Sequence, residues 1–587
     1  MKTFQFSRLS FLLLAFFIIV NACKKDPEVF PVPTISITGS ALSGLAGATV
    51  TLAATINAPA GLTQVTVLKN GAPFDAVSGG GATQTSLAYS KAYVIETLPA
   101  GTVINFTIQA IDTKNQSSSL SSIPVTVTAV PAKPIVVVPA GSLADGAVTW
   151  TAGNIYKLTG FVRVGEETVK GTITKKTTLT IEAGTLIIGD RASKGALIVQ
   201  RGSKIIANGT ASNPIIMTSE RAAGSREAGD WGGLVICGQA PNNLAEADRE
   251  LEGGYGAFHG GTDAADNSGS FKYVRVEFAG IPINPNQEVN SFTFGSVGNA
   301  TTVDYLQASY GLDDSYEWFG GTVNCKHLIA YKGLDDDFDT DNGFSGYVQY
   351  GIGIRGTTIA DQSGSNGFES DNNATAAATS PFTTAIFANM SIIGAKGAAE
   401  TSISPQFQHG AQIRRNSKQK IYNTLFIGYP WGVYVDSQLG DAKGNAKRGE
   451  IDFQNDVLIG IAGWGTNFWG TGGSISYNPR GTPVRDVEAN AASTPILIDT
   501  LTPTTWFKSL TGNKILDNRS ATGLNDNLWQ VGKPTFTLGA GADLLNKPLL
   551  STLPSFFDKT DYVGAFKDTD WTSSWSEFSP QTTTYIK

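Results

Sequence analysis

Two short acidic blocks decide the fold of this chain: Gly311-Leu-Asp-Asp-Ser-Tyr-Glu317 and, 22 residues later, Gly333-Leu-Asp-Asp-Asp-Phe-Asp339. Strand-like segments precede them at 303–309 and 324–331. A strand-containing unit that recurs at a short, fixed spacing is typical of a solenoid. With one turn per 22 residues, the two blocks lie on neighbouring turns, at the strand spacing of about 4.8 Å. A looser third copy, Ser365-Asn-Gly-Phe-Glu-Ser-Asp371, extends the pattern.

Short strands separated by Gly or Asn also fill the region upstream of these blocks, with no helical period between them. The segment Gly209-Thr-Ala-Ser-Asn-Pro-Ile-Ile-Met-Thr-Ser219 resembles the coil signature of right-handed β-helices in secreted bacterial proteins. We therefore predict a right-handed parallel β-helix over 145–480. The Trp-rich segment 481–587 is expected to cap the open end of the coil, because an exposed last rung is an unpaired edge.

The region before the solenoid has a different pattern. Residues 33–130 contain longer alternating strand candidates with turns every 8 to 12 residues, and Asn70-Gly71 is a hairpin signal. This pattern predicts an immunoglobulin-like β-sandwich that acts as a spacer. Residues 131–144, which include three prolines and a Val run, are expected to form a stiff linker. The whole chain is thus predicted to be all-β.

The N-terminal residues predict the cellular location of the protein. Lys2 and Arg8 precede an apolar stretch at 9–20, and Val20-Asn-Ala-Cys23 follows it. This is the layout of a secretory signal that resembles a lipobox. We expect 1–22 to be removed, Cys23 to be lipidated and 23–32 to form a tether. The charged tract after Cys23 is either a surface-export signal or only a solvated tether. We expect a lipid-anchored protein of the outer membrane, on the cell surface.

Composition limits the remaining functions. The formal net charge of −7 argues against nucleic acid as a partner.

Cys237 and Cys325 lie 88 residues apart, which is about four turns and roughly 19 Å along the coil. That distance exceeds the reach of a disulfide, about 7 Å, so we expect two free, packed thiols.

The acidic blocks are the sharpest local feature, because like charges stacked on neighbouring strands repel. Carboxylates about 5 Å apart either take up protons or share a cation, and hard oxygen ligands in loops suit calcium. Alternatively, Asp at β-helix corners tolerates tight turns and points into water. The candidate calcium ligands are Asp313, Asp314, Glu317, Asp335, Asp336, Asp339 and Asp341.

Aromatic residues near these carboxylates predict a glycan site, since sugar faces stack on rings and hydroxyls need acceptors. The alternative is core packing. The candidate ligand-binding aromatics are Tyr316, Trp318, Trp431, Trp464 and Trp469.

An enzyme is the other possibility. Right-handed β-helices include calcium-dependent pectate lyases with an Arg or Lys base, and inverting glycosidases with paired carboxylates. The candidate bases Arg355, Arg414 and Arg415 share no repeat register with the acidic blocks. The three histidines, His259, His327 and His409, are too dispersed for a metal triad. No catalytic residue is assigned.

Several segments together resemble a family of β-helical outer-membrane lipoproteins of Gram-negative bacteria that includes leptospiral members. They are Gly229-Asp-Trp-Gly-Gly233, His259-Gly-Gly-Thr-Asp263, Tyr273-Val-Arg-Val-Glu-Phe278, Asp313 to Gly321, Ile413-Arg-Arg415, and Tyr562-Val-Gly-Ala-Phe566 with Asp570-Trp571. The resemblance implies an outer-membrane location and a TonB-dependent receptor as partner, hence nutrient capture. It supplies no catalytic residues.

Three functions remain open. The first is a non-enzymatic, lipid-anchored surface protein whose calcium-stabilised β-helix binds a ligand such as a glycan. The second is a calcium-dependent polysaccharide lyase or glycoside hydrolase. The third is an adhesin or structural surface protein.

Overall fold

The structure is a computed structural model that describes residues 28–461, 503–518 and 543–585, apart from positions 40, 130, 168, 286, 399 and 400, together with 484–486, 501 and 529. The chain divides into two compact units, residues 1–132 and 133–587. The predicted signal segment and Cys23 lie outside the described residues. No helix among the described residues is long and apolar enough to cross a membrane.

The first unit is a β-sandwich of two sheets. One sheet has the order β1-β3-β6, and the other has the order β2-β8-β7-β4-β5. The strands are β1 (Thr34–Ile37), β2 (Leu42–Gly44), β3 (Thr49–Asn57), β4 (Leu62–Lys69), β5 (Ala72–Gly81), β6 (Ser86–Val94), β7 (Val103–Asp112) and β8 (Ser121–Val127). Alternate residues point into the core, as Ile104, Phe106 and Ile108 do on β7. The predicted sandwich is present, and its assignment as immunoglobulin-like stays a prediction.

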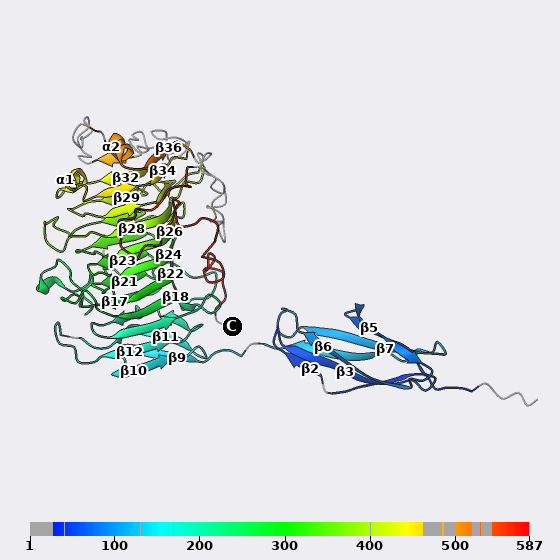
Figure 1. Cartoon of the computed structure of the whole chain (residues 1–587). Helices are drawn as coiled ribbons and strands as arrows, with labels where there is room; N and C mark the ends of the chain where they lie inside the picture. Colours follow the sequence, from blue (N-terminus) through cyan, green and yellow to red (C-terminus); the bar gives the residue numbers. More distant parts are fainter. Residues whose placement is uncertain are drawn as a thin grey trace, which may run out of the picture. The chain divides into compact units, whose positions relative to one another are not determined.

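The second unit is a right-handed parallel β-helix, as predicted. Its continuous sheet contains 26 strands of the described residues, and the pairings described within it are parallel (Figure 1). The early strands are β9 (Ile135–Ser142), β10 (Gly146–Trp150), β11 (Ile155–Val164), β12 (Thr177–Ile181), β13 (Leu186–Gly189), β14 (Ala196–Val199), β15 (Lys204–Asn208), β16 (Ile215–Ser219), β17 (Leu234–Cys237) and β18 (Gly269–Glu277). A 3-10 turn (Glu246–Asp248) and a hairpin of β19 (Pro282–Asn284) and β20 (Gln287–Glu288) lie in inserted loops.

The later part of the β-helix carries the repeat. Its strands are β21 (Phe292–Gly295), β22 (Thr302–Ser309), β23 (Tyr316–Phe319), β24 (Asn324–Tyr331), β25 (Phe338–Asp341), β26 (Tyr347–Ile354), β27 (Phe368–Ser370), β28 (Ile386–Ile393), β29 (His409–Ile413), β30 (Lys420–Tyr422), β31 (Leu425–Ile427), β32 (Trp431–Val435), β33 (Asp452–Gln454), β34 (Val457–Ile459), β35 (Val484–Asp486) and β36 (Lys514–Leu516). Two short helices, α1 (Ala442–Lys447) and α2 (Pro503–Ser509), follow β32 and β35.

The 22-residue turn is confirmed where the sequence showed it. Tyr316 pairs with Phe338 on the next strand, 22 residues later. The following turns are longer, because loops enter between the strands: Phe338 pairs with Phe368, and Phe368 pairs with Ala411. The repeat is therefore visible in the sequence only where a turn carries no insertion.

The inside of the coil is a stack of aromatic rings. Phe292, Tyr316 and Phe338 lie over one another with ring centroids 5.1 and 5.6 Å apart and nearly parallel planes. Parallel register places equivalent residues above each other, so each inward position repeats along the axis. Cys237 and Cys325 are buried and free, which confirms the prediction of two packed thiols. The expected separation of four turns is wrong: Cys237 pairs with Gly295 and Gly295 with Phe319, so little more than two turns lie between them, because a long loop enters after Cys237.

One corner of the coil repeats a left-handed backbone conformation. Residues there have φ between 49° and 63°, which an L residue adopts only with strain unless it is Gly, Asn or Asp. We call this set the corner column: Tyr273, Tyr305, His327, Tyr350, Asn389, Asn423 and Asn455.

Two predicted boundaries need correction. Residues 135–142, expected in the linker, form β9, which pairs with β11 and belongs to the β-helix. The C-terminal segment was expected to cap the open end. Within the described residues, α2 does pack on Phe453 near that end, but residues 543–585 run back along the side of the coil (Figure 1).

Hydrogen bonds from several rungs hold this returning segment. Asn423 donates to the carbonyl of Lys547, Gln349 to Asp558 and Gln307 to Glu577. Arg226, on an early rung, donates to the carbonyl of Pro580 at 2.6 Å. The segment therefore covers the corner column rather than the end of the solenoid.

Candidate functional site

A column of carboxylates lies on the outer face of three neighbouring strands. Glu317 on β23 pairs in register with Asp339 on β25, and Asp339 pairs with Glu369 on β27. Their neighbours Tyr316, Phe338 and Phe368 point into the core, so the alternation of a strand sends these acids outward. We call Glu317, Asp339 and Glu369 the acidic column.

The loops before these strands add two aspartates per rung. The Asp314 carboxylate accepts the backbone N–H of Asp336 at 2.7 Å, and the Asp336 carboxylate accepts the N–H of Asn366. Asn366 in turn accepts the N–H of His409 at 3.1 Å. One carboxyl or amide oxygen per rung thus ties the loops together. Asp314 and Asp336 therefore have a structural role as well as a place in the site.

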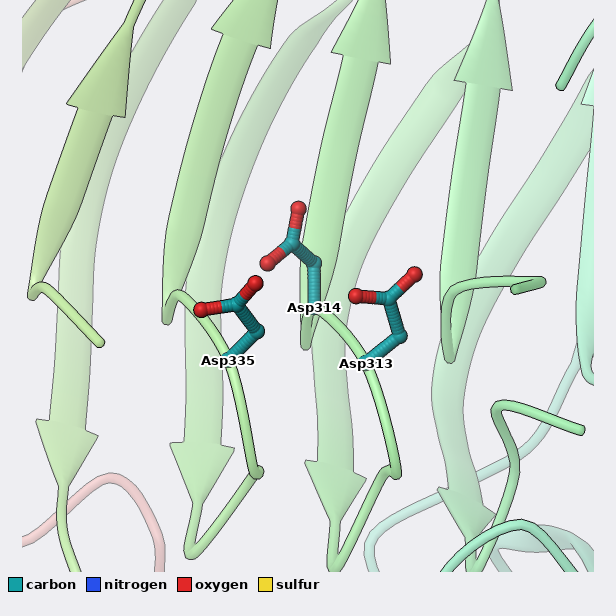
Figure 2. A group of neighbouring side chains, drawn as sticks. All are labelled: Asp313, Asp314 and Asp335. Atoms are coloured by element: carbon teal, nitrogen blue, oxygen red, sulfur yellow. The ribbon is translucent and has the colours of Figure 1, made fainter. Parts of the chain in front are cut away.

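Three carboxyl groups converge from two neighbouring rungs. Asp313, Asp314 and Asp335 point toward one another, with oxygen atoms within 4.8 Å (Figure 2). A second such group consists of Asp314, Glu317 and Asp339. The two groups share Asp314, so the first acidic loop is connected to the acidic column.

These residues line a cavity of about 690 Å³, which we call the acidic groove. Ten carboxylates and one guanidinium line it: Glu252, Glu288, Asp313, Asp314, Glu317, Asp335, Asp336, Asp339, Asp361, Glu369 and Arg414. Such an excess of acid in one hollow cannot stay fully ionised without positive charge.

The pKa values of the groove carboxyls follow from this crowding. Burial, and next the charge of Asp335, raises the pKa of Asp313 well above its ordinary value. Burial and then Glu369 do the same for Asp339. Burial raises the pKa of Asp335 to about 6, with Asp361 adding to the effect. The groove thus takes up protons near neutral pH when no cation is bound.

The donor set fits a hard cation. One oxygen of Asp335 and one of Asp339 are buried and have no hydrogen-bond partner among the described residues. Buried polar atoms without partners are rare and costly, and carboxylate oxygens in loops are the ligands that calcium prefers. Asp313, Asp314, Glu317, Asp335 and Asp339 are therefore the residues that would hold calcium.

The two other candidate ligands lie differently. Asp336 lines the groove, but its carboxylate is used by Asn366. Asp341 lines a neighbouring cavity of about 410 Å³ that also contains His259 and Glu250. Glu252 lines both cavities. Asp341 therefore does not belong to either group of converging oxygens.

Arg414 is the residue that the repeat pattern missed. Its guanidinium contacts Glu369 and donates to Asp371 at 2.8 Å, which places it in the groove beside the acidic column. The candidate bases were expected to share no repeat register with the acidic blocks, and Arg414 reaches Glu369 of the looser third copy through a contact that no repeat register predicts. The turn between Phe368 and Ala411 spans 43 residues, so no fixed spacing could have revealed this contact. Arg355, by contrast, is buried in an ion pair with Asp337 at 2.8 Å.

A model of a protein family, described as a pectate-lyase-like beta helix domain, matches residues 141–463. The chain belongs to this family. The match includes the acidic groove and Arg414, and it excludes the β-sandwich. The resemblance to outer-membrane lipoproteins stays a prediction.

Two further comparisons add little. A solved structure, that of a Yersinia enterocolitica family 28 exopolygalacturonase, is 10% identical over 83% of this chain and 99% of that chain, with a TM-score of 0.16. No curated protein is significantly similar to the chain in sequence.

The prediction that aromatic side chains beside the carboxylates form a glycan-binding surface is wrong for the three that the structure of this pectate-lyase-like β-helix describes. Tyr316 and Trp318 are 0% exposed and Trp431 is 5% exposed. Tyr316 and Trp318 occupy the inward positions that alternate with Glu317 and Phe319, so their rings stack in the core. Trp464 and Trp469 lie outside the described residues.

The three histidines have different partners. His259 contacts Ser296, His327 contacts Asp304 and His409 contacts Asn366. None belongs to a group of converging metal-ligand atoms among the described residues.

Proposed function

We propose that this protein is a glycoside hydrolase that cleaves a polysaccharide in the acidic groove. The observation that carries the proposal is the juxtaposition of Asp339, Glu369 and Arg414. The family description, pectate-lyase-like, supports a carbohydrate substrate. The sequence placed a non-enzymatic ligand-binding role first, and the geometry of the groove favours the enzyme instead.

The two carboxyls have different surroundings. One oxygen of Asp339 has no partner, and burial followed by the charge of Glu369 raises its pKa well above the ordinary value. Burial also raises the pKa of Glu369, to about 8, while the adjacent Arg414 opposes that rise. Two such groups on neighbouring strands share protons near neutral pH. We assign Asp339 as the proton donor and Glu369, oriented by Arg414, as the base or nucleophile.

A lyase that uses Arg414 as its base has weaker support. Burial opposes the charge on Arg414, but the carboxylates of Glu369 and Asp371 raise the pKa of the guanidinium above its ordinary value. A base has to give up its proton before the reaction, and these contacts keep the proton on Arg414.

We also propose that the groove binds calcium through Asp313, Asp314, Glu317, Asp335 and Asp339. The two groups of converging oxygens support this site. Calcium would offset the repulsion in the groove and supply a positive charge for an acidic sugar. A carboxylate that holds calcium is ionised, so Asp339 cannot bind calcium and donate a proton at the same time. Calcium held by Asp313, Asp314 and Asp335 leaves Asp339 available as the proton donor.

The location is proposed from the sequence. We propose that Cys23 carries lipid and holds the protein at the outer membrane, on the cell surface, with residues 33–130 as an immunoglobulin-like spacer. A polysaccharide outside the cell would then reach the groove directly. A TonB-dependent receptor, which would import the products, stays a prediction.

The test is cleavage of a panel of neutral and acidic polysaccharides by the mature protein, with and without calcium. New reducing ends without unsaturated products are expected. Asp339→Asn and Glu369→Gln should each lower kcat by about 10²–10⁴-fold. The matched control Asp145→Asn, an exposed carboxyl on an early rung, should keep full activity.

Unsaturated products would overturn hydrolysis in favour of a lyase. The absence of any product across the panel would leave binding or adhesion as the function. Activity that EDTA abolishes and calcium restores would show that the metal takes part, whereas activity in EDTA would assign the groove to acid–base chemistry alone.

A further inference from the structure

A second cavity lies on the side of the β-helix, under the returning C-terminal segment. It has a volume of about 350 Å³ and we call it the flank pocket. It is lined by His327, Tyr350, Asp558, Tyr562, Ala565, Phe566, Lys567, Asp568, Thr569 and Trp571. The volume falls near the lower end of the range for ligand sites, about 300–1,000 Å³.

The floor of the pocket is the aromatic part of the corner column. Tyr305 and His327 stack with centroids 4.2 Å apart, and His327 and Tyr350 follow at 5.0 Å. Because the ring faces contact one another, the ring edges and polar atoms point away from the column. The column therefore presents hydrogen-bonding groups on an apolar support.

The wall is held rigidly by Trp571. Its Nε1 donates to the carbonyl of Ala565 at 2.9 Å, and its ring stacks on Phe566 at 5.0 Å. Trp571 also contacts the His327 ring at 5.1 Å, with the planes 65° apart. Trp575 covers Tyr273 and Tyr305 edge-on, and the corner-column residues that line the pocket are His327 and Tyr350.

His327 has a defined orientation in the pocket. Its Nδ1 lies 2.7 Å from a carboxylate oxygen of Asp304. An ionised carboxylate only accepts, so Nδ1 donates to Asp304. Asp304 thus orients the His327 ring and leaves Nε2 as the nitrogen that can meet a ligand hydroxyl.

More of the carboxylates around the flank pocket have lysine partners than in the acidic groove. Asp558 pairs with Lys326 at 2.8 Å, and Lys567 pairs with Asp561 at 2.9 Å. Aromatic walls and a few directed acceptors, Asp568 among them, suit a molecule with many hydroxyls and no negative charge of its own.

We propose that the flank pocket binds a neutral sugar unit, independently of the activity proposed for the acidic groove. His327 accepts a hydrogen bond from one hydroxyl, and the Tyr562 hydroxyl and Asp568 bind others. The segments Tyr562-Val-Gly-Ala-Phe566 and Asp570-Trp571, which the groove does not use, build this site.

The test is ligand-observed saturation-transfer NMR with the full mature protein and neutral monosaccharides: glucose, galactose, mannose, xylose and arabinose. At least one should bind. His327→Phe keeps a stacked ring but removes both nitrogens, and Tyr562→Phe removes one hydroxyl. Each should weaken binding by about tenfold or more, as expected for a lost hydrogen bond that leaves a polar group unpaired.

Two controls separate this site from other effects. Tyr273→Phe also removes a tyrosine hydroxyl, but from a residue of the corner column that does not line the pocket. Asp339→Asn changes only the acidic groove. Both should bind the sugar as the wild type does. The proposal is overturned if no sugar of the panel binds, if galacturonate binds better than the neutral sugars, or if His327→Phe and Tyr562→Phe bind normally while folded.

Discussion

The acidic column and the corner column are two stacks of like residues on one coil, and they have opposite consequences. Parallel register places Tyr273 over Tyr305 and Glu317 over Asp339 in the same way. Stacked rings gain contact, and Asn455 donates to Asn423 at 3.2 Å, so neighbouring residues of the corner column attract one another. Stacked carboxylates repel and need protons, a cation or Arg414. The acidic column therefore needs a partner from outside its own stack, and the aromatic part of the corner column does not.

The largest effect is expected where a carboxylate is fully neutralised inside the coil. Arg355 and Asp337 are both buried and paired, so Arg355→Met leaves an isolated buried charge. We expect the free energy of unfolding to fall by about 3–5 kcal/mol. Urea denaturation measures this. Arg448→Met, at an exposed ion pair on α1's C-terminal side, serves as the control and should unfold like the wild type.

Calcium should stabilise the acidic groove by the next largest amount. A cation that binds only the folded state at 100 times its Kd adds about 2.7 kcal/mol to the free energy of unfolding. Thermal melts with calcium and with EDTA measure this at pH 8. An unchanged melting temperature would remove calcium from the groove.

The groove and the neighbouring cavity that contains Asp341 predict a pH dependence of stability in EDTA. The folded pKa of Asp335 is raised to about 6, that of Asp341 to about 7 and that of Glu369 to about 8. The folded state then holds more protons than the unfolded state between pH 4 and these values, so stability falls as pH rises through that window. Melts at pH 5 and pH 8 measure it, and calcium should narrow the difference. A higher melting temperature at pH 8 in EDTA would contradict the predicted crowding.

The corner column gives a smaller effect. Asn423 donates to the carbonyls of Lys547 and Tyr562, and Asn423→Ala removes both hydrogen bonds. The substitution also places Ala in the left-handed backbone conformation of this position. We expect a loss of about 1–3 kcal/mol. Hydrogen exchange should rise in residues 543–585 and stay unchanged in β23 and β25. Equal exchange in wild type and variant would show that this contact does not hold the segment.

The smallest expected change is in the melting temperature when the acidic column loses one charge. Asp339→Asn removes one charge from the acidic column, so in EDTA at pH 8 it should raise the melting temperature slightly while it abolishes cleavage. Asp145→Asn should leave both unchanged. A lower melting temperature for Asp339→Asn would mean that Asp339 is stabilising even without a cation.

The candidate site was predictable in part. The seven carboxylates were visible because two uninterrupted 22-residue turns repeat them, and five of them converge. Arg414 was not, because loops of variable length separate it from the column. The prediction that the aromatic residues bind a ligand was wrong for another reason. Tyr316 and Trp318 lie next to acids in sequence, but successive residues of a strand face opposite sides.

The sequence by itself determined the all-β class, the solenoid, the 22-residue turn and the packed free thiols, since each depends on local periodicity or on a minimum distance along the coil. The tertiary structure alone decided the partners across turns: Arg414 beside Glu369, Arg355 beside Asp337, and Trp571 against His327. Loop lengths and a chain that returns 200 residues or more later set these contacts, and no local pattern of residues encodes them.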